Sequence, residues 1–320
     1  MKKKLNKSWK VEVLKAYWDK PEKIGRKVAK QYGVPWATMF DFKQRIIQGV
    51  IKYEDTVTKP KILLFDVETA PILSHVWSLW DQRVGLNQVM CDWYMLSWSA
   101  KWLGEEEVYH DRLYNHLSFE ENPEDDYNII VSLWEMLDQA DIIIGHNLKK
   151  FDDKKFKARC LYHGLTEPSS YRRVDTLDIA KRAFKLTSNK LDYLATYLKV
   201  PNKVSHEGHG LWVKCMAGEQ TAWDVMTEYN NYDVVLLEDV YLQIRHWSNN
   251  HPNVAVFYDD DYERCTLCGS VELENTGHLV FTNLASYEEV RCKCCSKLSR
   301  RSSNLLSKDK RSNLLRNYNR

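Results

Sequence analysis

The feature that most constrains how this chain can fold is the stretch KILLFDVETA, residues 61–70. Its apolar residues 62–65 predict a short buried strand. Because side chains alternate along a strand, Asp66 and Glu68 are expected on the same face. Two carboxylates so close repel each other and raise each other's pKa. A bound cation would offset this repulsion, so the stretch predicts a metal site where the strand leaves the core.

Length and composition limit the class of protein. With 320 residues, 44% hydrophobic and 28% charged, the chain is expected to form two or three globular domains. It contains no apolar run of about 18 residues, so we expect no membrane span. The basic start MKKKLNKSWK is not followed by an apolar signal core, so we expect a cytoplasmic protein rather than a secreted one.

Charge is distributed very unevenly along the chain. The net charge is only +2, but residues 1–60 carry a net +9, residues 291–320 a net +9, and residues 61–290 a net −16. Basic ends around an acidic centre are typical of a protein that holds nucleic acid at its ends and uses metal ions at its centre. The alternative is a chain with two solubilising ends.

The N-terminal region, residues 1–55, has helical periodicity and resembles a helix-turn-helix domain of transposases and regulators. Pro21 is expected to open the first helix of the pair, and Gly33 to lie at the turn. The resemblance implies that the second helix enters the major groove of DNA. It would present Trp36 to the bases, with Lys43 and Arg45 near phosphates. The alternative is a small helical packing module with a basic surface.

The central region, residues 60–250, repeats the pattern of a buried strand followed by polar side chains. Residues 142–144 predict a second buried strand, which is followed by Asn147 and by Asp152 at a helix start. The stretch EYNNYD begins a helix on which Tyr229 and Asp233, four residues apart, share one face. The stretches WYMLSWSAKWL and EEVYHDRLYNH predict an antiparallel meander with the first strand, and NIIVSLWEMLDQA predicts a helix.

These stretches resemble the three motifs of the 3′–5′ exonuclease superfamily whose members carry four acids, Asp-Glu-Asp-Asp, and which includes the proofreading domains of DNA polymerases. FDVET matches the first motif at Asp66 and Glu68, and NLKKFD matches the second at Asp152. YNNYD matches the third at Tyr229 and Asp233, which is the tyrosine (DEDDy) subtype. The resemblance covers roughly residues 60–248 and implies an α/β, RNase H-like core.

The resemblance also implies a two-metal-ion reaction with Mg²⁺ or Mn²⁺, which carboxylates bind well. Asp66 is expected to bridge both ions. Glu68 and Asp233 are expected to hold the ion nearer the attacking water, and Asp152 the other ion. Tyr229 would position that water and help to deprotonate it.

Two further residues are expected to bind substrate on the basis of the same resemblance. Thr69 and the backbone amides of FDVET would contact the terminal nucleotide. Asn147 would contact the 3′ end or brace the loop that carries Asp152.

The C-terminal region contains two Cys-x-x-Cys pairs, in CTLCGS and CKCC, which predict a zinc ribbon over residues 258–298. Two such pairs can close one tetrahedral site for a single structural Zn²⁺. The expected ligands are Cys265, Cys268, Cys292 and Cys295. Cys294 is an alternative to Cys295 that would leave a less regular spacing. The basic tail, residues 299–320, is expected to be partly disordered and to contact phosphates.

Together these features predict a metal-dependent 3′–5′ exonuclease, similar to phage enzymes related to proofreading domains, with DNA as its partner and the host cytoplasm as its location if a phage encodes it. The ends could instead bind a replicative polymerase or another replication protein. The alternatives are an RNA 3′-end trimming enzyme of the ribonuclease D kind, a transposase-like DNA-cutting enzyme, and a catalytically silent DNA-binding regulator. The sequence leaves the choice of DNA or RNA, and of single or double strand, open.

Overall fold

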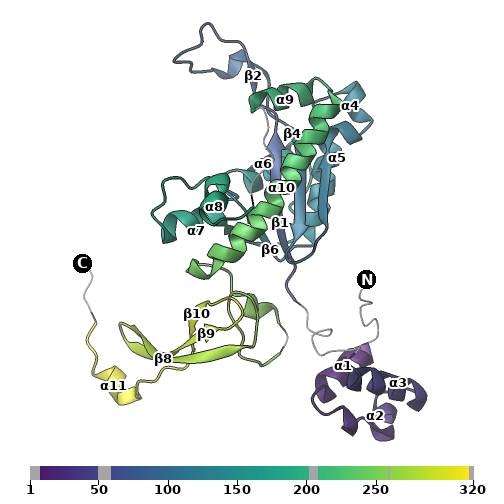
Figure 1. Cartoon of the computed structure of the whole chain (residues 1–320), viewed down its shortest axis with the longest axis vertical. Helices are drawn as coiled ribbons and strands as arrows, with labels where there is room; N and C mark the ends of the chain where they lie inside the picture. The colour runs from purple at the N-terminus through teal and green to yellow at the C-terminus, as the bar shows by residue number, and fades with distance from the viewer. Residues whose placement is uncertain (1–7, 50–58, 202–207, 259, 317–320) are drawn as a thin grey trace. The chain divides into compact units, whose positions relative to one another are not determined.

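The computed structural model describes residues 8–49, 59–201, 208–258 and 260–316. The chain forms two compact units. The first contains Met1–Lys59 and Val256–Tyr262, and the second contains Pro60–Ala255 and Glu263–Arg320. Figure 1 shows the first unit as a group of helices and the second as a sheet with helices, followed by a smaller sheet.

The first unit is built from short helices around one apolar core. They are α1 (Ser8–Tyr17), the 3₁₀ turn η1 (Pro21–Lys23), α2 (Arg26–Gln31) and α3 (Trp36–Ile47). The expected helix start at Pro21 is wrong, because Pro21 opens only η1. Ile24 then adopts an extended backbone and is fully buried in the core before α2 begins. Gly33 lies between α2 and α3 with φ +63°, a conformation that suits glycine.

A five-stranded mixed sheet forms the centre of the second unit. Its strands are β1 (Ile62–Thr69), β4 (Met95–Trp102), β5 (Val108–Arg112), β6 (Ile142–Gly145) and β7 (Arg172–Asp175), in the order β5-β4-β1-β6-β7. β1 pairs antiparallel with β4 and parallel with β6, so it lies at the middle of the sheet. The α/β class and the antiparallel meander expected from the sequence are confirmed.

Helices cover both faces of this sheet. The long helix α10 (Gln220–Ile244) crosses one face and contacts β1, β4 and β5 (Figure 1). α5 (Tyr127–Asp138) packs on the other face, where the indole of Trp98 donates to the carbonyl of Ile129. The remaining helices are α4 (Ser118–Glu121), α6 (Asp152–Tyr162), α7 (Thr176–Ala183), α8 (Leu191–Tyr197) and α9 (His209–Met216), with 3₁₀ turns at Leu86–Gln88, Leu113–Asn115, Arg245–Trp247 and Val254–Phe257.

A hairpin that the sequence analysis did not predict leaves the sheet between β1 and β4. It is formed by β2 (Leu73–Ser74) and β3 (Val89–Cys91), which pair only with each other. We call residues 71–94 the arm; in Figure 1 it extends beyond the end of the sheet beside α9.

The C-terminal part of the second unit is a three-stranded sheet in the order β10-β9-β8. Its elements are β8 (Leu273–Thr282), β9 (Ala285–Cys292), β10 (Leu298–Arg300) and the short helix α11 (Lys308–Ser312). The tail therefore contains regular structure up to α11, and residues 317–320 lie outside the described residues. In the part of the chain that is described, no helix has the length and apolarity needed to cross a membrane.

Candidate active site and cysteine cluster

Four acidic residues meet on the face of the sheet that α10 covers. We call Asp66, Glu68, Asp152 and Asp233 the acid cluster. Burial and the negative charges of Asp152, Glu68 and Asp233 raise the pKa of Asp66 well above its ordinary value. Four acids from β1, α6 and α10 are thus close enough to act on one another electrostatically, although the sequence separates them by more than 160 residues.

Asp152 is the most deeply buried member, with an exposed fraction of 1%. It begins α6, and its Oδ1 accepts a hydrogen bond from the backbone N–H of Val67, at 3.3 Å. Its Oδ2 is buried and accepts no hydrogen bond from any described residue. Burial raises the pKa of Asp152 to about 7. A buried carboxylate oxygen that accepts no hydrogen bond is well suited to bind a cation.

Tyr229 joins the cluster from α10. Its ring lies 6.3 Å from that of Trp212 on α9, at an interplanar angle of 70°. Burial and the charges of Asp233 and Glu68 raise the pKa of Tyr229, so its hydroxyl stays protonated at neutral pH. The side chain can therefore donate a hydrogen bond to an oxygen at the cluster.

Asn230 is a site residue that the sequence analysis missed. It is fully buried, and its Nδ2 donates to Oδ2 of Asp66 at 2.8 Å. Ser97 on β4 in turn donates to Oδ1 of Asn230 at 3.3 Å. The signal was present in the sequence, because Asn230 precedes Asp233 by three residues and so shares its helical face.

The polar residues of β4 explain why α10 lies where it does. Ser97 and Ser99 pair with Glu68 and Asp66 across the sheet, so they lie on the same face. Ser99 donates to Oδ1 of Asn231 at 2.7 Å, and Lys101 forms a buried ion pair with Glu238. Alternate residues of β4, which lie on one face of the sheet, are therefore polar, and they contact polar residues of α10.

A pocket opens beside the acid cluster at the end of β1. It has a volume of about 410 Å³ and is lined by Thr69, Ala70, Pro71, Ile72, Trp93, Lys155, His209 and Trp212. The ammonium of Lys155 lies 3.5 Å from the centre of the Trp93 ring. The volume is within the range of about 300–1,000 Å³ that is typical of small-molecule sites.

Asn147 follows β6 and lines a second pocket, of about 600 Å³, with Lys181 and Lys190. Its backbone has φ +69°, which is uncommon for a residue other than glycine. The carboxylate of Asp175 holds this conformation, since its Oδ1 accepts from the N–H of Asn147 at 3.0 Å and its Oδ2 from that of Lys149 at 3.1 Å.

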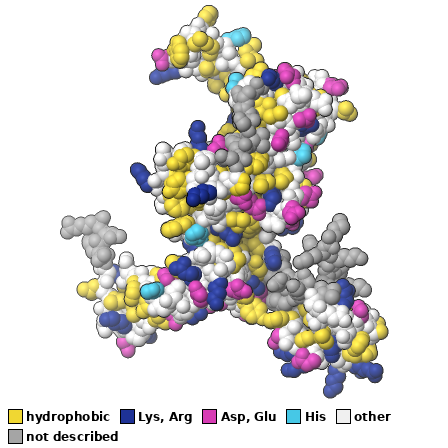
Figure 2. Space-filling model, viewed as in Figure 1, with side chains coloured by type: hydrophobic (Ala, Val, Ile, Leu, Met, Phe, Trp, Pro, Cys, Tyr) yellow, Lys and Arg dark blue, Asp and Glu magenta, His cyan; other side chains and the backbone are white. Residues whose placement is uncertain are grey.

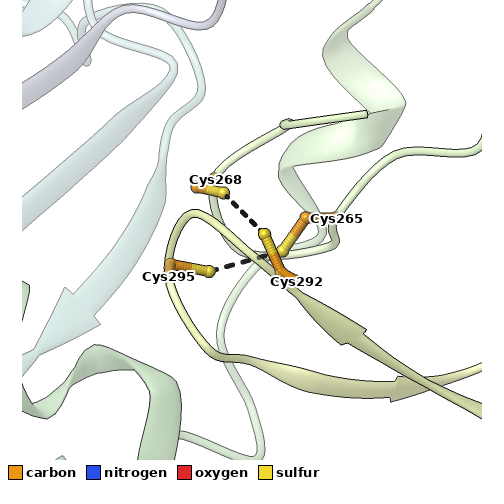
Figure 3. Close-up of side chains that lie close together, drawn as sticks. All are labelled: Cys265, Cys268, Cys292 and Cys295. Carbon is orange, nitrogen blue, oxygen red and sulfur yellow. Dashed lines mark hydrogen bonds between the residues drawn. The ribbon is translucent and has the colours of Figure 1, made fainter. Parts of the chain in front are cut away.

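The four cysteines expected to bind zinc lie together beside the C-terminal sheet, on the turn before β8 and at the end of β9 and on the turn that joins it to β10 (Figure 3). The Sγ atoms of Cys265 and Cys295 are 3.5 Å apart, and those of Cys268 and Cys292 are 3.6 Å apart. A tetrahedral Zn²⁺ with bonds of about 2.3 Å would hold its sulfur atoms about 3.8 Å apart, so the donor set fits this ion. Cys294 is exposed and lies outside the group.

The acid cluster has a more open geometry than the cysteine cluster. Among the described residues, only the four cysteines bring three or more potential ligand atoms within 4.8 Å of one another. The acidic oxygens are therefore spaced more widely than ligands closed around a single ion.

The residues expected to contact DNA lie in the first unit, on α3. The ring of Trp36 is half-buried against the core, 5.7 Å from that of Phe40. Lys43 donates from Nζ to the backbone carbonyls of Glu22 and Ile24, each at 3.1 Å, so its ammonium has partners within the unit. Arg45 is exposed.

Comparison with known families supports the fold. A family model described as the RNase_H superfamily matches residues 105–245. The match covers less than half of the chain and begins after β1, so Asp66 and Glu68 lie outside it. The sheet order and this match show an RNase H-like α/β fold, as the sequence predicted. An RNase H-like domain supports assignment to the nucleases.

Among solved structures, one that matches is the family B DNA polymerase from the hyperthermophilic archaeon Pyrobaculum calidifontis. It has 14% sequence identity and a TM-score of 0.46, and the match covers 59% of this chain and 25% of the polymerase chain. This chain thus spans about a quarter of the length of that protein. No curated protein matches the sequence.

Proposed function

We propose that the chain is a metal-dependent 3′–5′ exonuclease that hydrolyses phosphodiester bonds from the 3′ end of DNA. The observation that carries the proposal is the convergence of Asp152, Glu68 and Asp233 on Asp66, with Tyr229 beside them. Carboxylates with raised pKa, one of them with an unsatisfied buried oxygen, favour bound cations over an empty site. Two Mg²⁺ or Mn²⁺ ions would, when bound, stabilise charge on the attacking and leaving oxygens.

The chain's own residues would orient the reactants. Asp66 lies centrally in β1 and is held by Asn230, which acts as a positioning residue. Tyr229 keeps its proton, so in this proposal it orients the attacking water by donating a hydrogen bond and does not take the proton from it. In this proposal the pocket that begins at Thr69 would hold the terminal nucleotide.

The other parts of the chain have supporting roles in this proposal. The cysteine cluster would hold one structural Zn²⁺, since four protein ligands leave no open position for chemistry. Helix α3 of the first unit would contact DNA through Arg45 and Trp36, as a helix-turn-helix does. Lys43 would stabilise the unit through its carbonyl contacts.

The test is digestion of 5′-labelled single strands of DNA and RNA with Mg²⁺ or Mn²⁺. We expect products that shorten from the 3′ end, and a fall of roughly 10³-fold or more for Asp66→Asn, since a ligand of a preorganised metal site is lost. Asp141→Asn is the matched control, because Asp141 is an acid of the same unit whose side chain accepts from the N–H of Lys61 at 2.7 Å.

Three outcomes would overturn the proposal in whole or in part. Equal cleavage of a circular strand or of one with a blocked 3′ end would indicate an endonuclease or transposase. Unchanged activity of Asp66→Asn would exclude the acid cluster as the active site. Digestion of RNA alone would keep the site and the mechanism but assign the chain to RNA trimming.

A further inference from the structure

The arm displays large apolar side chains to solvent. Trp77 is 98% exposed and Trp80 82% exposed. Figure 2 shows hydrophobic side chains on the surface of the arm, with a few charged side chains among them. Soluble proteins rarely expose so many neighbouring apolar groups unless they bind something. The full set of exposed large apolar residues on the arm is Ile72, Leu73, Val76, Trp77, Leu79, Trp80, Val84, Leu86 and Met90.

The display is fixed by hydrogen bonds within the arm. The N–H of His75 donates to the carbonyl of Gln88 at 2.9 Å, and Nε2 of Gln88 donates to the carbonyl of His75 at 2.9 Å. Nε2 of Gln82 donates to the carbonyl of Trp80 at 2.7 Å. These hydrogen bonds tie the two sides of the arm together, while its large apolar side chains remain exposed.

The arm is continuous with the candidate active site. The N–H of Ala70 donates to the carbonyl of Tyr94 at 2.9 Å and closes the base of the arm directly after β1. Its first residues, Pro71 and Ile72, line the pocket that begins at Thr69. A strand whose last nucleotide occupied that pocket would therefore leave it next to the arm.

The arm carries little charge, which limits what it can recognise. Its formally charged side chains are Asp81, Arg83 and Asp92, a net of −1. It therefore offers little attraction to phosphates, and the two indole rings are its most specific feature. Unpaired nucleobases stack on such rings without any need for charge, and each stacked base is worth about tenfold or more in affinity.

We propose that Trp77 and Trp80 stack against unpaired bases of the strand whose 3′ end lies at the acid cluster. This inference rests on the proposed nuclease function and makes its substrate single-stranded nucleic acid. Bases in a duplex are paired and stacked on each other, so their faces are not available to the arm. Phosphate contacts would come from basic residues elsewhere in the chain.

The experiment compares full-length variants in binding to a labelled single-stranded oligonucleotide and to a blunt duplex, with Ca²⁺ in place of Mg²⁺ to prevent digestion. Trp77→Ala/Trp80→Ala should raise the Kd for the single strand by roughly 10–100-fold and the Kd for the duplex much less. The ratio of variant to wild-type Kd should be the same at two salt concentrations, because the lost contacts carry no charge.

Three further variants separate stacking from general apolar contact. Trp77→Phe/Trp80→Phe should restore most of the affinity, since a phenyl ring still stacks. Trp77→Leu/Trp80→Leu should not, although leucine is equally apolar. Leu79→Ala, which removes a side chain that is 87% exposed on the same arm, should have little effect.

Other results would overturn the inference. If the leucine variant binds the single strand as well as the phenylalanine variant, or if Leu79→Ala is as harmful as the tryptophan double variant, the arm contacts the strand by general apolar contact and not by stacking on the two indole rings. If the wild type self-associates in sedimentation and the double variant does not, the arm binds a second copy of the chain. Normal binding with no digestion would reject the proposed function alone, and normal digestion with unaltered binding of the double variant would reject the role of the arm alone.

Discussion

At the scale of single residues, two neighbouring aspartates show how environment assigns different roles to the same side chain. Asp152 and Asp153 are each only 1% exposed. Asp153 has ample partners, since it accepts from Tyr171 Oη at 2.7 Å and pairs with Arg173 at 2.8 Å. Asp152 has one backbone donor to its Oδ1 and a pKa raised to about 7. Asp153 therefore stabilises the fold, whereas the ionised form of Asp152 destabilises it.

Asp152→Asn is accordingly predicted to stabilise the protein and to abolish nuclease activity. The pKa of Asp152 is raised from 3.8 to about 7, so ionisation costs folding free energy as the pH rises through this range. In buffer without divalent cations, the variant should melt at a higher temperature than the wild type. Each kcal/mol gained in the free energy of unfolding should raise the thermal midpoint by about 2–4 °C. The difference should be absent below pH 4, and added Mn²⁺ should stabilise the wild type more than the variant, because Asp152→Asn removes one of the four carboxylates.

Asp153→Asn is the matched control for that prediction. It should lower stability by about 1.5–3 kcal/mol, because hydrogen bonds to a charged group are lost, and it should keep most of its activity below the melting temperature. A destabilised Asp152→Asn protein would contradict the account of the acid cluster.

At the scale of elements, α10 is positioned by the buried ion pair of Lys101 and Glu238. Oε1 of Glu238 also accepts from the N–H of Gly104 at 2.7 Å, so this one carboxylate joins α10 to both β4 and the turn after it. Because α10 carries Asn230 and Asp233, the same contacts fix the geometry of the acid cluster. Stability and site geometry are thus coupled through one helix.

A double-mutant cycle on this pair tests the coupling. Lys101→Met alone should cost about 3–5 kcal/mol, since it leaves a buried carboxylate unpaired. Lys101→Met/Glu238→Gln should cost less than the single change, because the amide is neutral and can still accept from Gly104. Denaturant unfolding of the wild type, both single variants and the double variant gives the interaction energy. Additive effects would show that the pair does not act as a unit.

The elements that could be predicted from the sequence are those with a strong apolar period. β1 and α10 combine buried runs with acids at defined positions, and β6 is a buried run that is followed by Asn147 and Asp152, so the type of each element and its candidate site residues could be predicted together. β7 could not, because it has only four residues and two of them are exposed arginines. The arm could not either, since its tryptophans look like core residues until the structure shows them in solvent. Asn230 shares a helical face with Asp233, but only the fold brings it within hydrogen-bonding distance of Asp66 on β1.

At the scale of the whole molecule, net charge over long ranges hides local structure. Residues 61–290 carry a net −16, yet residues 149–190 carry a net +7 within them. That basic stretch contributes Lys155 to the pocket beside Thr69, and Lys181 and Lys190 to the pocket beside Asn147. The central region can therefore attract phosphates close to the acid cluster by itself, without depending only on the basic ends.

The C-terminal sheet, β8 to β10, is joined to the rest of the second unit by specific hydrogen bonds. Lys297 donates from Nζ to the backbone carbonyls of Ser248, at 2.6 Å, and His246, at 3.3 Å. The N–H of Val254 donates to the carbonyl of Thr266 at 2.7 Å. Loss of the proposed zinc should therefore loosen the C-terminal sheet first, while the acid cluster, whose carboxylates prefer Mg²⁺ or Mn²⁺, remains in place.

Adjacent cysteines provide a test of that separation. Cys295→Ser should reduce the zinc content from about one ion per chain, because Cys295 is within the cluster, whereas Cys294→Ser should leave it unchanged. Hydrogen exchange should show lost protection in β8 and β9 of Cys295→Ser and retained protection in β1 and β4. Nuclease activity with Mg²⁺ should survive on short single strands. Full zinc in Cys295→Ser together with loss in Cys294→Ser would reassign the fourth ligand, and equal loss of protection in β1 would show that the two sites are not independent.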